Sequence, residues 1–351
     1  MPRSRLTRGL ALTAALAVAA VTAGCSSASP SGGSSAPDEP VTLTVYTDQH
    51  AELVEALTAA YTDKTGVKFN IQQDATAGQI QAEGKASPAD IFLSEDPAPV
   101  AQLGKAGLLS TIDKKTLSQV RPWLNSGEGQ WVAYAARTRV LYYNPSVIAE
   151  AELPKTLADI VDPAYQGAFA YAPSGAFVAT TQYLISTIGE AKTTEFLTAL
   201  KANGVNEHKN GNVRDTVEAG KHAMGLSNHY YWWIKAAEVG GPENMASKIY
   251  HFPETDAGNL VLSSGAAILK SSKHHDAAAA FVEWLTSADG GQKILATGDI
   301  DRSGAQYPAA VGVSSKLVGS LDDIASPHFD MDIFGDQSEA ADLLKKLGMS
   351  D

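Results

Sequence analysis

The sequence is almost free of cysteine, the residue that forms disulfides and holds soft metals. Its 351 residues contain one cysteine, Cys25, close to the N-terminus. The mature fold therefore has no intramolecular disulfide, and cysteine catalysis and thiolate metal sites are excluded. Long apolar runs are also missing. After residues 10–20, no stretch approaches the roughly 18 apolar residues that a membrane-spanning helix needs.

Sequence signatures of common enzymes are absent as well. The chain has no G-x-x-x-x-G-K-[ST] phosphate loop, no H-E-x-x-H zinc helix and no G-x-S-x-G nucleophile elbow. Ser174, followed by Gly175, could serve a secreted hydrolase as a nucleophile, but no flanking motif supports that reading. We therefore predict a protein that is not an enzyme.

Positive charge is scarce relative to negative charge. The formal net charge is −12, and 19% of the residues are charged. A strongly acidic surface argues against nucleic acid or anionic lipid headgroups as direct partners. Such a surface is compatible with a protein that attracts a small cation.

The N-terminus has the features of an export signal. An arginine-bearing segment leads into the apolar run 10–20, which has the length of a signal h-region and is too short to span a bilayer. Small residues then precede Cys25, as in a lipoprotein signal site. We predict a signal peptide over 1–24, and a lipidated Cys25 with a flexible Ser/Gly/Pro-rich linker over 25–40. The protein would then be extracytoplasmic and lipid-anchored, at a cell surface or in a periplasm. The alternative is an ordinary cleaved signal with a stray cysteine.

The chain after residue 40 has the patterns of an α/β fold. Residues 41–45 alternate as a strand, a helix follows with Asp48 as its expected N-cap, and 67–71 form a second strand. Another strand, 90–93, ends just before Glu95. Ligands of open α/β sheets bind beyond the carboxyl ends of the strands, where His50 and Glu95 both lie.

Length and pattern together favour two lobes. We expect strands over 131–135 and 140–143 to cross between the lobes, and a strand over 259–269 to return. The predicted helices include 177–188 and 195–202.

The most unusual segment holds four consecutive aromatic residues, 230–233. In the simplest interpretation they form a core or interface cluster at the start of a helix. The alternative uses the phenols of Tyr230 and Tyr231. A strongly charged cation can displace the phenolic proton, and hard trivalent iron prefers anionic oxygen ligands.

The chain resembles the bacterial periplasmic ferric-ion-binding proteins, the bacterial transferrins that serve ABC importers, from Val41 to about Pro308. The similarity is collinear, and it is the order and combination of the matching stretches that make it specific. These stretches are 45–50, 65–69, 83–92, 106–109, 137–140, 173–177, 228–232 and 263–270.

The resemblance implies a two-lobe periplasmic-binding-protein fold of type II, with a hinge and a cleft between the lobes. On this basis lobe 1 comprises 41–136 and 258–310, and lobe 2 comprises 137–257 and 311–351. In the family, one His, one Glu and two consecutive Tyr bind ferric iron in the cleft. The matching residues of this sequence are His50, Glu95, Tyr230 and Tyr231.

The resemblance also implies a synergistic anion, phosphate or carbonate, beside the metal. The matching anion-binding residues are Ser174, Gly175, Ala176, Asn210 and Asn228. One departure concerns Asp96, because phosphate-assisted members often have Gln after the ligand Glu. A carboxylate beside a bound anion is repulsive unless it is protonated or bridged.

The implied function is that of the substrate-binding component of an ABC importer, which captures Fe3+ and delivers it to a permease. We expect a monomer that does not bind nucleic acid. Three alternatives stay open. They are a protein of the same fold for another ligand (an iron chelate, an oxyanion or an organic cation), a secreted hydrolase, and a solute sensor that partners a membrane receptor without transport.

Overall fold

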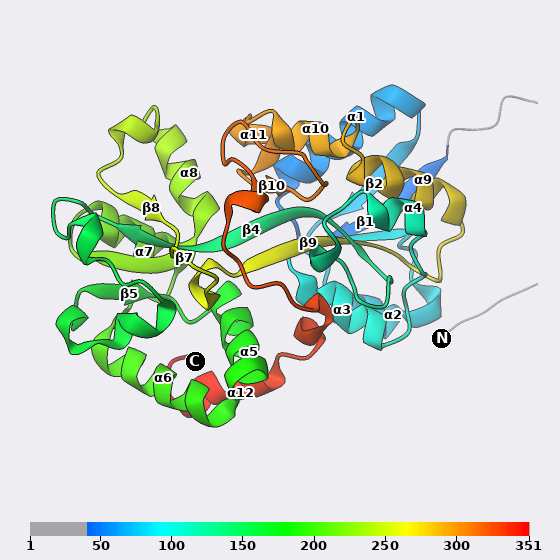
Figure 1. The fold of residues 1–351 in the computed structure, drawn as a ribbon. Coiled ribbons are helices and arrows are strands. Elements are labelled where there is room, and N and C mark those ends of the chain that lie inside the picture. Colours follow the sequence, from blue (N-terminus) through cyan, green and yellow to red (C-terminus); the bar gives the residue numbers. More distant parts are fainter. Residues whose placement is uncertain (1–40, 351) are drawn as a thin grey trace, which may run out of the picture. The chain divides into compact units, whose positions relative to one another are not determined.

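A computed structural model of the chain describes residues 41–350 (Figure 1). The predicted signal peptide 1–24, Cys25 and the linker 25–40 lie outside the described residues. No helix among the described residues is long and apolar enough to cross a membrane.

The first elements form the strand–helix–strand unit expected from the sequence. Strands β1 (Thr42–Thr47) and β2 (Lys68–Gln72) are parallel and joined by α1 (Ala51–Thr65), and β3 (Ile91–Ser94) pairs with the other edge of β1. Helix α1 ends at Gly66, whose φ of 78° is left-handed and whose N–H donates to the carbonyl of Thr62. A glycine adopts this conformation without steric cost, so the chain can turn into β2.

The long strand β4 (Val132–Tyr143) joins the two halves of the sheet (Figure 1). Its residues Val132–Thr138 pair antiparallel with β9 (Val261–Ile268), and Arg139–Tyr143 pair antiparallel with β7 (Met224–Asn228). The sequence predicted two separate strands over 131–135 and 140–143. The structure corrects this, because the intervening residues 136–139 stay paired, the first three with β9 and Arg139 with β7.

The complete sheet has the order β2-β1-β3-β9-β4-β7-β5-β6, with β8 and β10 also paired to β4. The additional strands are β5 (Phe169–Tyr171), β6 (Val205–Asn206), β8 (Lys248–Tyr250) and β10 (Tyr307–Pro308). The helices after α1 are α2 (Ala77–Glu83), α3 (Pro97–Lys105), α4 (Lys114–Ser118), α5 (Ala176–Ile188), α6 (Glu190–Asn203), α7 (Asn210–Glu218), α8 (His229–Glu238), α9 (His275–Thr286), α10 (Gly291–Ala296), α11 (Ile300–Ser303) and α12 (Ser338–Lys346).

Two large hydrophobic clusters lie in the two halves of this sheet. The first includes Phe92 and Trp131, and the second includes Phe169 and Leu226. Each such side chain contributes about 1.5–3 kcal/mol when it is fully buried. The clusters give each half its own core and leave the polar residues in the middle of β4 between them.

The C-terminal segment was expected to pack on lobe 2 throughout residues 311–351, but it is divided. Met331 and Phe334 belong to the first cluster, because the short helical turn Met331–Gly335 packs on α3. Helix α12 packs on α5 and adds Leu344 to the second cluster, and the turn Met331–Gly335 contacts α5 as well as α3. The other predicted lobe boundaries stay a prediction.

Candidate metal centre

The four predicted metal ligands lie just after strand ends. His50 follows β1 and immediately precedes α1, and Glu95 directly follows β3. Because β1 and β3 are parallel neighbours, their carboxyl ends place these two side chains together. Tyr230 and Tyr231 lie in the first turn of α8, which begins where β7 ends.

Three of the four side chains gather around one carboxylate oxygen. His50 Nε2 lies 3.6 Å from Glu95 Oε1, and the Tyr230 hydroxyl donates to the same oxygen at 3.5 Å. The ring of Tyr231 packs on that of Tyr230, with centroids 4.3 Å apart. The structure therefore brings residues from both halves of the sheet to one point, although they are more than 130 positions apart in sequence.

Arg137 on β4 fixes the Glu95 carboxylate in its ionised form. Its Nη1 donates to the Glu95 main-chain carbonyl, and its Nε lies 4.0 Å from Glu95 Oε1. Burial by itself would raise the pKa of Glu95, but the neighbouring His50 imidazole and the charge of Arg137 lower it to about 2. The nearby Glu95 carboxylate in turn raises the pKa of His50. At neutral pH this pair presents an anionic oxygen and an imidazole.

The phenol of Tyr230, in contrast to the Glu95 carboxyl, is held in its protonated form. Tyr230 is only 4% exposed, and burial together with the charge of Glu95 raises its pKa well above the usual value. Its hydroxyl accepts a hydrogen bond from Asn228 Nδ2 at 3.4 Å. The free protein therefore holds a neutral phenol, and only a strongly charged cation would displace its proton.

Asp48, which the sequence suggested as the N-cap of α1, has a different role. His50 occupies the N-cap position without a capping side-chain bond. The Asp48 carboxylate instead accepts hydrogen bonds from the Glu95 main-chain N–H at 2.8 Å and from the Ser94 hydroxyl at 3.3 Å. Burial raises the pKa of Asp48 to about 6. Asp48 thus holds the loop that carries Glu95.

Asp96, the residue that departs from the family pattern, is paired with Arg137. Nη2 of Arg137 donates to Asp96 Oδ1, and the Asp96 side chain is 35% exposed. This ion pair offsets the charge that would otherwise face the cleft. It also means that Arg137 is already occupied by two neighbouring carboxyl-bearing residues, Glu95 and Asp96.

The predicted anion-binding residues are only partly connected to the four ligands. Asn228 contacts Tyr230, whereas Asn210 begins α7 and its Oδ1 accepts from the Ser227 hydroxyl at 3.3 Å. The turn Ser174–Ala176 forms the start of α5, and Gly175 has a φ of 56° that favours glycine. No hydrogen bond within residues 41–350 joins this turn to the ligands.

Sequence reasoning missed His229, which anchors the tyrosines. His229 is fully buried, its Nδ1 accepts from the Thr138 N–H at 3.2 Å, and its Nε2 donates to the Ala305 carbonyl at 2.7 Å. Burial lowers its pKa to about 3, so the ring is neutral. Its position beside the tyrosine pair was the available signal, but the sequence analysis gave His229 no role.

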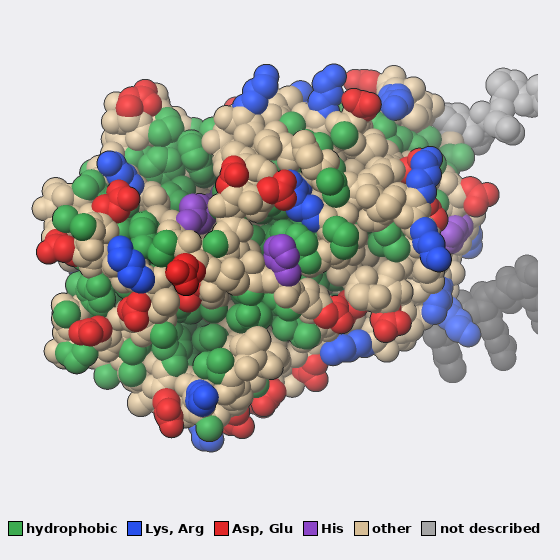
Figure 2. All heavy atoms as spheres, in the orientation of Figure 1, with side chains coloured by type: hydrophobic (Ala, Val, Ile, Leu, Met, Phe, Trp, Pro, Cys, Tyr) green, Lys and Arg blue, Asp and Glu red, His purple; other side chains and the backbone are tan. Residues whose placement is uncertain are grey.

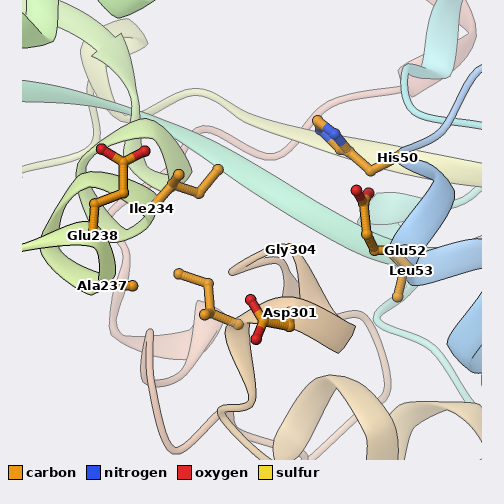
Figure 3. A pocket seen from close by; sticks show the side chains of 9 residues that line it. His50, Glu52, Leu53, Ile234, Ala237, Glu238, Asp301 and Gly304 are labelled. Atoms are coloured by element: carbon orange, nitrogen blue, oxygen red, sulfur yellow. The ribbon is translucent and has the colours of Figure 1, made fainter. Parts of the chain in front are cut away.

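A cavity of about 690 Å³ opens beside His50 (Figure 3). His50 and Glu52 face Ile234 and Glu238 of α8 across it, with Asp301 of α11 on the remaining side. These carboxylates give the cavity an acidic lining and disfavour an anionic solute there.

Two further features of the described residues concern metal binding and surface charge. Residues 41–350 contain no group of three or more His, Cys, Asp and Glu side chains that could hold a metal ion. On the face drawn in Figure 2, acidic and basic side chains are intermingled, without a large basic area.

The fold and the inter-lobe site are those of a solute-binding protein. Residues 46–292 match the family described as bacterial extracellular solute-binding protein, and the chain belongs to that family. It is 37% identical over 294 residues to the Fe(3+)-binding periplasmic protein of Serratia marcescens, covering 82% of this chain and 85% of the relative. It is 34% identical over 321 residues to the major ferric iron-binding protein of Neisseria meningitidis serogroup B, covering 88% and 93% respectively.

Solved structures agree with these relatives. Iron-bound HitA from Pseudomonas aeruginosa superposes with a TM-score of 0.78 at 38% identity, covering 88% of this chain and all of that structure. Apo FutA2 from Synechocystis superposes with a TM-score of 0.76 at 24% identity, covering 89% and 100%, which supports the fold alone. The resemblance to ferric-ion-binding proteins and the two-lobe α/β type II fold are both confirmed.

Proposed function

We propose that this protein is the substrate-binding component of an iron importer and captures ferric iron between its lobes. The ligands would be the imidazole of His50, the carboxylate of Glu95 and the phenolates of Tyr230 and Tyr231. The observation that carries the proposal is the meeting of Tyr230 and His50 at Glu95 Oε1, at 3.5 and 3.6 Å. Relatives that are 33–37% identical are named for ferric iron binding.

The charges of the proposed ligands match the ion. Two phenolates and one carboxylate offset the three charges of Fe3+, and neutral His50 adds none. Hard trivalent cations prefer such anionic oxygen donors. Four protein donors leave room in an octahedral shell for an anion, such as phosphate or carbonate, for which Ser174–Ala176, Asn210 and Asn228 are the proposed residues.

The ligands come from both halves of the sheet, so a bound ion would hold the lobes together. His50 and Glu95 follow β1 and β3, whereas the tyrosines start α8. A ligand that binds both lobes favours the closed state over the open one. We propose that the closed, iron-loaded monomer docks on an ABC permease, and that Cys25 tethers it by lipid to the outer side of the cytoplasmic membrane.

Visible absorption tests this function directly. The purified protein is titrated with a ferric donor in phosphate-free buffer. We expect a tyrosinate-to-iron charge-transfer band that saturates at one iron per chain. A protein that shows no such band and retains no metal after desalting would have the family fold with a different ligand.

A competition experiment separates free ferric iron from an intact chelate, the main alternative. The acidic cavity beside His50, lined by Glu52, Glu238 and Asp301, disfavours anionic chelates such as ferric citrate. We expect excess citrate to remove iron from the protein without binding itself. Co-purification of radiolabelled citrate with the iron at equal stoichiometry would instead favour chelate capture.

A further inference from the structure

One edge of β4 has a gap in its hydrogen-bond ladder. On this edge β10 pairs with Ala135 and Ala136, and β7 pairs from Arg139 onward. The Arg139 N–H donates to the carbonyl of Leu260 on the opposite edge, and successive residues of a strand alternate, so the Thr138 N–H points into the gap. This N–H therefore needs an acceptor that neither β10 nor β7 supplies.

The imidazole of His229 fills the gap. Its Nδ1 accepts from the Thr138 N–H at 3.2 Å, and its Nε2 donates to the Ala305 carbonyl at 2.7 Å. A main-chain N–H can only donate, so Nδ1 is unprotonated and the ring hydrogen is on Nε2. We call this pair of hydrogen bonds the His229 bridge. It joins the residue after β7 to the residue two positions before β10.

The acceptor Ala305 belongs to the first half of the molecule. It follows α11, which packs on α1, the helix that begins directly after His50. Ala305 is 1% exposed and has a φ of 56°, a left-handed conformation that a residue with a side chain keeps only where its surroundings hold it. The ring of Tyr307, with its centroid 4.6 Å from that of His229, packs beside the bridge.

The bridge lies where β4 passes from one half of the sheet to the other. Thr138 is the last residue of β4 that pairs with β9, and Arg139 is the first that pairs with β7. A bend of β4 at this point changes the separation of β10 and β7, which the bridge spans. His229 is also the first residue of α8, directly before Tyr230 and Tyr231. Such a bend therefore has to break the Nε2 bond or turn the helix start that carries the tyrosines.

We infer that His229 is a positioning residue, which couples the bending of β4 at Thr138 to the orientation of Tyr230 and Tyr231. With the bridge formed, the two halves of the sheet stay close and the Tyr230 hydroxyl meets Glu95, as it does in this structure. The consequence for iron rests on the proposed function. The consequence for closure does not require iron, so the two can fail separately.

Two substitutions break the bridge at different ends. H229N retains a side-chain oxygen near the position of Nδ1, which can accept from Thr138, but its shorter side chain does not reach Ala305. H229Q is long enough to donate to Ala305 but has no acceptor beside Thr138. The matched control is H222N. His222 is 6% exposed and its Nε2 lies 2.8 Å from Glu207 Oε1, so it is a buried, bonded histidine outside the proposed site.

Small-angle X-ray scattering of the iron-free protein tests the effect on closure. We expect a larger radius of gyration for H229N than for the wild type, because the bond that holds the two halves together is lost. H229Q and H222N should have the wild-type radius. A folded H229N with the wild-type radius would overturn the inference, whatever the result with iron.

Visible absorption and iron release test the effect on the tyrosines. In H229N we expect the tyrosinate-to-iron band to shift and iron to pass to excess chelator about tenfold faster, the lower end of the loss seen for outer-shell partners. H222N should match the wild type in both. A residue with a purely structural role would lower stability without moving the band. An unshifted band with wild-type release in H229N would therefore contradict the inference.

Failure of the proposed function gives a different result. If the wild-type protein shows no ferric charge-transfer band, the ligand assignment is wrong, and the scattering comparison alone decides whether His229 controls closure.

A measurement on the unmodified protein covers the case in which the His229 variants do not fold. Gallium(III) is a diamagnetic trivalent cation, so histidine signals near it stay visible in nitrogen-15 NMR. We expect the Nε2–H of His229 to exchange with water more slowly when gallium is bound. The indole N–H of Trp131, which donates to Asp332 at 2.9 Å, should exchange equally in both forms. Equal exchange of the His229 Nε2–H with and without bound gallium would overturn the inference.

Discussion

The two halves of the candidate site differ in how completely their charges are paired. On the side of β1 and β3, Glu95 and Asp96 are both compensated by Arg137, and Asp48 accepts from the Glu95 main chain. On the side of α8, the Tyr230 phenol is neutral, and Nε and Nη2 of Arg139 have no hydrogen-bond partner within residues 41–350. The first half is therefore prearranged, whereas the second half is incomplete in its pairing.

The largest loss of ferric-iron affinity is expected from changes in the incomplete half, on the side of α8. Y230F or Y231F removes an oxygen that would bind iron as a phenolate, and a phenyl ring cannot replace it. Changing an outer-shell partner already costs about 10–100-fold in metal affinity, so we expect a loss above about a hundredfold. Competition with a chelator of known affinity measures it.

The matched control for these variants is Y250F. The Tyr250 hydroxyl donates to the Pro154 carbonyl at 3.3 Å, outside the site. Ferric affinity should be unchanged in Y250F. Wild-type affinity in Y230F or Y231F would show that the tyrosines belong to a structural cluster only.

In the prearranged half, E95Q should weaken iron binding by about 10–100-fold. The amide keeps the shape of the side chain but loses the anionic charge that His50 and Arg137 stabilise. The control is E52Q, which removes a carboxylate that lines the cavity beside His50 without belonging to the site. Equal losses in the two variants would mean that the acidic lining acts through its field and that Glu95 is not a ligand.

The ion pairs of Arg137 with Glu95 and Asp96 should also contribute to the free energy of unfolding. R137M leaves Glu95 and Asp96 without their cation, and breaking a buried pair from one side costs about 3–5 kcal/mol. Because Asp96 is 35% exposed, we expect the lower end of that range in urea unfolding of the iron-free protein. R137M combined with D96N should recover part of the loss. Strict additivity of the two changes would contradict the proposed compensation.

The smallest effect is expected for D48N. The amide oxygen can still accept from the Glu95 main-chain N–H, so the loop that carries Glu95 should keep its position. We expect iron affinity to change by less than about threefold, since one neutral hydrogen bond replaces a charged one of similar geometry. D48A, which removes the acceptor, is the contrasting variant. A large loss in D48N would indicate that Asp48 contributes charge to the bound ion.

Much of the fold followed from the sequence. The strand–helix–strand start was readable because the apolar residues alternate in Leu43 and Val45 and because Gly66 ends the helix. The continuity of β4 was not readable. Arg137 and Arg139 interrupt the apolar pattern, and they are buried only because the fold brings Asp96, Glu95 and Asn228 to them. Because these partners are distant in sequence, the burial of the two arginines produces no periodic pattern in the sequence around them.

The site was predicted through a family resemblance, while its supporting residues were not. Asp48 was interpreted as a local helix cap, although its partner Glu95 is 47 positions away. His229 was given no role, although it bonds to Thr138 and Ala305. A sequence pattern indicates hydrogen-bond partners that are close in sequence, whereas the partners of these two side chains in the fold are distant in sequence. The role of His50, Glu95, Tyr230 and Tyr231 as ligands stays a prediction.

Crystallography of the iron-loaded protein, with anomalous data collected at the iron edge, tests the central claim most directly. We predict a single strong anomalous peak about 2 Å from the donor atoms of His50, Glu95, Tyr230 and Tyr231, with both phenol oxygens on the metal. A peak elsewhere, or iron held without the tyrosine oxygens, would contradict the account.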